Sequence, residues 1–157
     1  MKVIEAIKAS GLDVREARLL LAEVCGFSQA SLAASPEQEI PFEVENAFFE
    51  LTEKRKAGVP VAYLLGRKEF YGIELSVNPS VLIPRPETEM LVDLALERMP
   101  ASVLDLGTGS GCLLLAALGE WPEAEGLGID RSSEALAVAA HNIDLHAVTG
   151  PGGGAAA

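Results

Sequence analysis

The chain has 157 residues, of which 49% are hydrophobic, enough apolar sequence for one ordinary domain or two small ones. Its formal net charge is −11. Because so acidic a chain gains nothing from counterion release on DNA or RNA, we expect no direct nucleic-acid partner.

The sequence shows no signal for metal binding, secretion or membrane insertion. Its two cysteines, Cys25 and Cys112, lie in apolar runs and predict small reduced side chains rather than a metal site. The first residues include Glu5 and no targeting pattern. The longest apolar run, 112–118, is far shorter than the ~20 residues of a membrane span. We expect a cytoplasmic protein with no membrane partner.

The first third of the chain predicts helices joined by short connections. Asp13, followed three residues later by Glu16, matches a capping box, and Gly26 marks the end of that helix. Pro41 opens another amphipathic stretch. The pattern predicts a small helical domain over 1–59.

A connecting segment, 60–84, follows the helices. Two short alternating runs on either side of Tyr71-Gly72 predict a β-hairpin. Pro86 then stands where a helix can start, and acidic residues in the first turn favour its dipole. We expect that helix to end before Pro100.

The next segment alternates strand and helix. The pattern predicts strands at 103–106 and 125–129, a helix over 112–120 and a last helix to about 143, capped by Ser132 or Ser133. This order is typical of a βαβ unit with a parallel sheet, and therefore of an α/β fold. The Gly/Ala-rich tail, 149–157, predicts a flexible end.

The first strand runs into three glycines at alternate positions, Gly107, Gly109 and Gly111. Such a turn lets a ligand approach the backbone at a helix N-terminus. No lysine follows Gly111, which excludes a P-loop. Cys112 and Leu114 occupy the places where a dinucleotide-binding fingerprint needs its third small residue, which excludes that motif too.

Two acidic residues flank the glycines. Asp105 precedes them, and its carboxylate would repel a pyrophosphate but attract an ammonium or sulfonium group. Asp130 ends the next strand, where an acid can accept both hydroxyls of a ribose. Asp130 also suits the cap of the following helix, and the two roles are compatible. Together these residues predict a site for S-adenosyl-L-methionine.

The sequence is similar to the release-factor glutamine methyltransferases, the HemK/PrmC family, over nearly all of 1–143. The resemblance rests on the motifs YLLG and EFYG within 63–72, LIPRPETE at 82–89, DLGTGSG at 105–111 and GID at 128–130. The glycine motif is shared by many methyltransferases, whereas IPRPETE is much more specific.

The resemblance implies an α/β Rossmann-like methyltransferase fold preceded by a small all-α domain. It implies transfer of a methyl group from S-adenosylmethionine to the side-chain amide nitrogen of glutamine in the Gly-Gly-Gln motif of peptide chain release factors, with the helical domain helping to hold the release factor. The stretch 85–89 would lie near the methionine end of the cofactor, although physically it reads as a helix entry. The cofactor residues so implied are Arg85, Pro86, Glu87, Thr88, Asp105, Gly107, Thr108, Gly109, Ser110, Gly111 and Asp130.

The chain departs from the family in one respect. The family's catalytic Asn-Pro-Pro-Tyr motif, which orients the substrate amide, is absent, and Asn78-Pro79 precedes the glycine loop and reads as a turn. We therefore assign no catalytic residue and expect a truncated member, with 85–148 as the first part of the catalytic domain, inactive by itself. A shifted reading frame near Thr149 would explain the tail.

Two other functions compete with this one. The chain suits a non-catalytic docking module for a release factor or another protein. A methyltransferase acting on a nucleic-acid base uses a similar motif, but the acidic charge and the RPETE stretch argue against it. An unpaired edge of a short parallel sheet would also be open to self-association.

Overall fold

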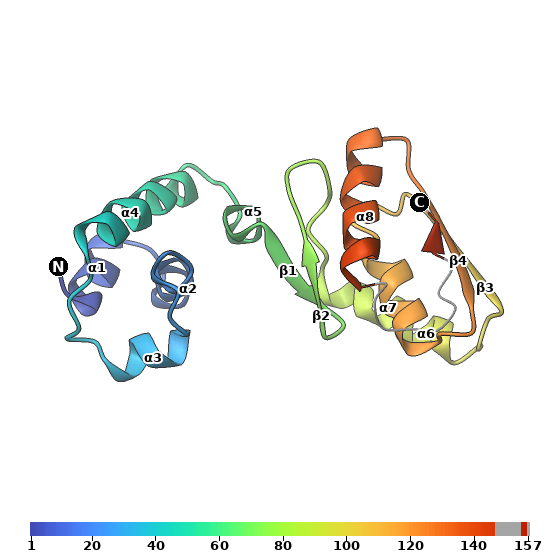
Figure 1. The fold of residues 1–157 in the computed structure, drawn as a ribbon, viewed down its shortest axis with the longest axis horizontal. Helices are drawn as coiled ribbons and strands as arrows, with labels where there is room; N and C mark the ends of the chain where they lie inside the picture. Colours follow the sequence, from blue (N-terminus) through green and yellow to red (C-terminus); the bar gives the residue numbers. More distant parts are fainter. Residues whose placement is uncertain (147–154, 157) are drawn as a thin grey trace. The chain divides into compact units, whose positions relative to one another are not determined.

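The computed structural model describes residues 1–146 and 155–156, and the chain divides into two compact units (Figure 1). The first unit is Met1–Leu65 and the second is Gly66–Ala157. The first unit consists of α1 (Val3–Ser10), α2 (Val14–Cys25), α3 (Gln29–Ala34), α4 (Phe42–Lys56) and α5 (Val61–Leu65). None of the helices in the described part of the chain has the length and apolar character needed to cross a membrane.

The ends of α2 follow the sequence signals. The Asp13 side chain accepts from the backbone N–H of Arg15 at 2.9 Å, and Gly26 ends the helix at φ 70°. The expected capping box is wrong in one detail, the role of Glu16. Its carboxylate faces the guanidinium of Arg55 with two contacts of 3.0 Å, joining α2 to α4.

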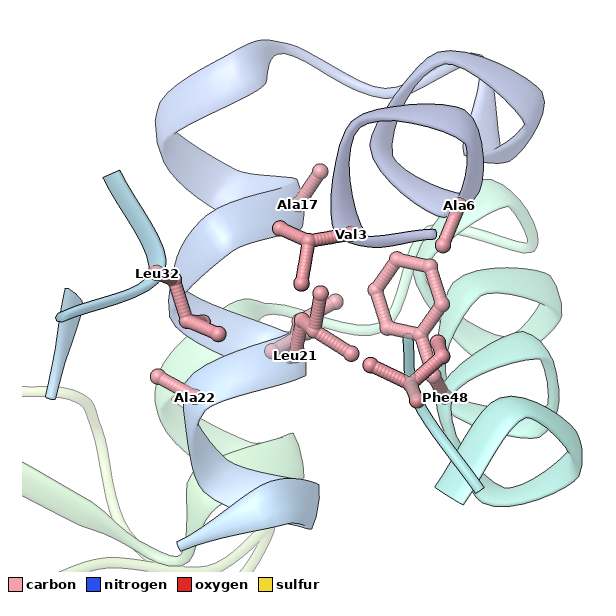
Figure 2. Close-up of a cluster of buried hydrophobic side chains, with 9 residues drawn as sticks. Val3, Ala6, Ala17, Leu21, Ala22, Leu32 and Phe48 are labelled. Atoms are coloured by element: carbon pink, nitrogen blue, oxygen red, sulfur yellow. The ribbon is translucent and has the colours of Figure 1, made fainter. Parts of the chain in front are cut away.

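Helices α1, α2 and α4 enclose the core of the first unit (Figure 2). Phe48 of α4 has no exposed surface and points toward Val3 and Ala6 of α1 and Leu21 of α2. Leu32 attaches the short α3 to the same cluster. The cluster consists of Val3, Ala6, Ala17, Leu20, Leu21, Ala22, Leu32, Ile40 and Phe48.

The second unit begins with the expected hairpin. Strands β1 (Arg67–Phe70) and β2 (Ile73–Ser76) pair antiparallel, and Tyr71 and Gly72 form the turn at φ 50° and 75°. The helical structure expected at Pro86 also begins there, as η1 (Pro86–Thr88) followed by α6 (Glu89–Leu96).

The βαβ unit has the predicted order. It consists of β3 (Ser102–Leu106), α7 (Cys112–Glu120), β4 (Glu125–Ile129) and α8 (Ser133–His146). Strands β3 and β4 run parallel, with Leu106 opposite Ile129 at the carboxyl end. Within the tail that was expected to be flexible, Ala155–Ala156 instead form a short strand, β5, which pairs in parallel with β4. The rest of the predicted flexible tail, 149–157, lies outside the described residues.

Helices cover one face of this sheet. Figure 1 shows α7 and α8 on the same side of β3 and β4. A Cβ added at Gly126 would lie 2.6 Å from Leu118 Cδ1, so α7 packs directly on the bare backbone of β4. The alternate side chains of the two strands belong to the other face and are between 45% and 69% exposed: Leu104, Leu106, Leu127 and Ile129. This face of the two strands therefore remains largely exposed to solvent.

Candidate cofactor site

The glycine loop connects the carboxyl end of β3 to the start of α7. Gly107, Gly109 and Gly111 have φ of 75°, 55° and 80°, the left-handed region that side chains disfavour. The backbone N–H groups of Gly107 and Thr108 both donate to the carbonyl of Ile129, at 2.8 and 3.0 Å. The loop is therefore anchored across the carboxyl edge of the sheet, where α/β proteins place their ligands.

The three glycines face different surroundings. A Cβ added at Gly107 would meet nothing within 4 Å, and one at Gly109 would meet only the Gly107 carbonyl at 4.0 Å. A Cβ at Gly111 would lie 3.6 Å from both Ala139 Cβ and Leu115 Cδ1. The first two positions therefore leave backbone open to a ligand, whereas the third lies against α7 and α8.

Asp130 fastens the loop to the start of α8. Its Oδ2 accepts from the Gly109 N–H and its Oδ1 from the Ser132 N–H, each at 3.0 Å. These two hydrogen bonds lower the pKa of Asp130, so the carboxylate is ionised at neutral pH. Ser132, one of the two predicted caps, accepts from the Ala135 N–H at 3.1 Å. The half-buried carboxylate keeps further lone pairs for a ligand.

Asp105 holds the base of the same loop. Its Oδ2 accepts from the Thr108 hydroxyl at 2.9 Å, and Thr108 itself is buried. A Cβ added at Gly128 would lie 2.7 Å from Thr108 Oγ1, so β4 needs a glycine there. Sequence reasoning gave Gly128 no such role, although its alternation with Gly126 on β4 could have suggested close packing.

The residues 85–88 stand apart from this hydrogen-bonded group. Arg85, Pro86 and Glu87 are exposed and Thr88 is half-buried. Among residues 1–146, no hydrogen bond or ion pair joins any of these four to the glycine loop. The following residue, Glu89, accepts from the backbone N–H of Tyr71 at 2.9 Å and so holds the hairpin turn on α6.

Sequence reasoning also missed Asn142. It is fully buried in α8, where its Nδ2 donates to the carbonyls of Ser110, at 2.9 Å, and Ser76, at 3.0 Å. Its Oδ1 accepts from the Ser76 N–H at 2.7 Å. The available signal was a single amide on the otherwise apolar face formed by Ala135 and Val138.

A hollow of about 450 Å³ lies elsewhere on the second unit, between the segment after β2 and α8. None of the residues that line this hollow belongs to the glycine loop. In the part of the chain that the structure describes, no three His, Cys, Asp or Glu side chains gather in a way that could hold a metal ion.

Comparison with known proteins gives two family matches. The model of the PrmC N-terminal domain matches residues 2–66, and the model of ribosomal protein L11 methyltransferase (PrmA) matches residues 88–151. The second match contains the glycine loop and Asp130, and the first corresponds to the helical unit.

Curated relatives agree with these matches. A release factor glutamine methyltransferase from Caulobacter vibrioides is 45% identical over 151 residues, covering 90% of this chain and 52% of that protein. Those from Burkholderia pseudomallei and Escherichia coli are 41% and 38% identical, covering 88% and 94% of this chain and 50% and 54% of theirs. The chain thus spans about half the length of the curated relatives it matches. Along most of its own length, it is related by sequence to the family of release factor glutamine methyltransferases.

Proposed function

We propose that the glycine loop, with Asp105 and Asp130, binds S-adenosyl-L-methionine, and that the second unit is the first part of a Rossmann-like methyltransferase domain. The observation that carries the proposal is the open backbone at Gly107 and Gly109, held between two carboxylates. No lysine or arginine contributes to the hydrogen bonds that fix this loop in the described structure, so a cationic ligand suits it better than a phosphate.

The chain's own residues fit the parts of that cofactor. The remaining lone pairs of Asp130 can accept the ribose hydroxyls, while its present hydrogen bonds fix the direction of the carboxylate. Asp105 places negative charge at the base of the loop, suited to an ammonium or sulfonium group. Residues 85–88 would complete the site at its methionine end. When bound, the cofactor supplies a methyl group activated on sulfur.

We extend the proposal to the whole protein from the names of its relatives. The full-length enzyme would methylate the side-chain amide nitrogen of glutamine in the Gly-Gly-Gln motif of a release factor, in the cytoplasm. The helical domain, 1–59, would hold the release factor, and 60–84 would connect it to the methyltransferase part, 85–148. Because the sequence contains no Asn-Pro-Pro-Tyr, we propose that this chain alone binds cofactor without transferring its methyl group.

Calorimetric titration with S-adenosylmethionine tests cofactor binding. Asp130→Ala removes the ribose acceptor, and Gly107→Ala places a methyl group in the open space above the loop. Both should weaken binding by tenfold or more. Gly72→Ala is the matched control, because it adds the same methyl group in open space at the same φ of 75°, outside the glycine loop. A cofactor affinity that is unchanged in Gly107→Ala would overturn the proposed site.

Transfer and docking need a separate experiment. The chain is mixed with a release factor and S-adenosylmethionine labelled in its methyl group, and both retention of the release factor and labelling of the glutamine are measured. Retention without labelling is the expected result. Retention by a chain that binds no cofactor would instead support the docking module. Labelled glutamine would show that this chain is active by itself.

A further inference from the structure

We infer that Asn142 is a positioning residue that holds the cofactor loop in its binding conformation and ties it to the β-hairpin. The effect on cofactor affinity rests on the proposed function, but the effect on the loop does not. Asn142 has no exposed surface and lies outside the loop itself, in α8.

The hydrogen bonds of Asn142 reach two distant parts of the chain. One hydrogen of its Nδ2 goes to the Ser76 carbonyl and the other to the Ser110 carbonyl, while Oδ1 accepts from the Ser76 N–H. Both donors of the amide are therefore used. The Ser76 backbone therefore bonds to the Asn142 side chain through both its N–H and its carbonyl, as it would to a neighbouring strand.

The bond to Ser110 fixes one peptide group of the glycine loop. The Ser110 carbonyl belongs to the peptide group whose N–H, that of Gly111, donates to the Thr108 carbonyl at 2.8 Å. This peptide group is thus held at its oxygen by Asn142 and at its nitrogen by Thr108. The adjacent Gly109 N–H is held by Asp130. The side chains of Asp130 and Asn142 therefore fix the loop backbone at two successive residues, Gly109 and Ser110.

Loss of the amide donors leaves buried groups without partners. An apolar residue at 142 would orphan the Ser110 and Ser76 carbonyls and the Ser76 N–H together. Asn142→Asp is more selective, since it keeps the acceptor for the Ser76 N–H and replaces by oxygen only the nitrogen that donates to the Ser110 and Ser76 carbonyls. It should loosen the loop while leaving that hairpin contact in place.

Amide hydrogen exchange on the complete chain, free of cofactor, tests whether Asn142→Asp loosens the glycine loop more than the hairpin contact at Ser76. In Asn142→Asp, exchange at the Gly111 amide should accelerate by about tenfold, the factor expected for one lost buried hydrogen bond, while exchange at Ser76 changes less. Val92→Ala is the control: Val92 is fully buried in the same unit, in α6, and its loss removes apolar packing but none of the loop's hydrogen bonds. Denaturant is added so that both variants are compared at equal global stability.

Cofactor binding is measured on the same variants. Asn142→Asp should bind S-adenosylmethionine about tenfold more weakly than Val92→Ala at matched stability. In the unaltered chain, the cofactor should also slow exchange at Ser76, and this response should be lost in Asn142→Asp. If Gly111 exchanges equally fast in both variants, Asn142 only supports the fold and the inference is wrong. If the unaltered chain binds no cofactor, the proposed function fails, whereas the exchange at Gly111 still decides the role of Asn142.

Discussion

The two units of the chain bury their apolar surface in different ways. In the first unit, helices from four parts of the sequence close on one cluster, in which Phe48 has no exposed surface (Figure 2). In the second unit, helices cover one face of the parallel sheet, while Leu106 on the other face is 69% exposed. A helical bundle can be completed by neighbours in sequence, whereas a parallel sheet needs cover that arrives from far along the chain.

The largest expected effect comes from truncating Phe48, a fully buried residue in the core of the first unit. Phe48→Ala should destabilise the first unit by ~3–5 kcal/mol, because it removes a fully buried aromatic ring and leaves a cavity in the core. Helix content, followed by circular dichroism in denaturant, reports this loss. Phe42→Ala on the same helix is the control, since Phe42 is 69% exposed and its loss should change stability by about 0.5 kcal/mol or less.

The same variant tests whether the two units unfold independently. The chain has one tryptophan, Trp121, which lies in the second unit just after α7. Its fluorescence transition should stay in place in Phe48→Ala if each unit unfolds by itself. A shift equal to that of the helical signal would mean that the units unfold together, and that the closed core also stabilises the sheet.

A smaller effect is expected where the covered face of the sheet meets the loop. Gly128→Ala should destabilise the second unit by ~1–3 kcal/mol, because the new Cβ would lie 2.7 Å from Thr108 Oγ1, which is held by Asp105. Trp121 fluorescence in denaturant measures it. Gly119→Ala, in open space on α7, should be neutral or slightly stabilising. Equal stability of the two variants would show that Thr108 is free to move aside.

The next effect depends on pH. Hydrogen bonds from Ser132 and Gly109 lower the pKa of Asp130 below its ordinary 3.8 in the folded chain. The ionised group therefore stabilises the fold above the unfolded pKa, and this contribution is lost as the pH falls through the lower folded value. The difference in unfolding free energy between the unaltered chain and Asp130→Asn should be present at about pH 6 and should disappear below about pH 4. A difference that does not change with pH would contradict these contacts.

The smallest effect concerns the hairpin turn. The Tyr71 hydroxyl donates to Asp93 Oδ1 at 2.7 Å, and this bond, with nearby carboxylates, raises the pKa of Tyr71 to about 12. Phenolate absorbance should show one tyrosine ionising at that pH, and the step should be absent in Tyr71→Phe. Asp93→Asn should lower the pKa toward 10.0. An unchanged titration in Asp93→Asn would show that the hairpin turn is not held on α6 in this way.

The sequence by itself determined the elements that depend on neighbouring residues. Asp13 and Gly26 marked the ends of α2, Tyr71-Gly72 marked the hairpin turn, and the bounds of α7 and β4 followed from apolar runs and turn residues. Caps, turns and periodicity act over a few residues, so they can be read without knowing the fold. The glycines and acids of the loop were visible for the same reason.

Only the tertiary structure decided which partner each polar group takes. Glu16 bonds to Arg55 and not back to its own helix, and β5 joins a sheet that was expected to have two strands. Asn142 read as an ordinary helix residue, yet it joins Ser76 and Ser110, which lie 66 and 32 positions away along the chain. Such contacts depend on how elements pack rather than on local pattern, because a buried polar group bonds to whatever the fold brings within reach.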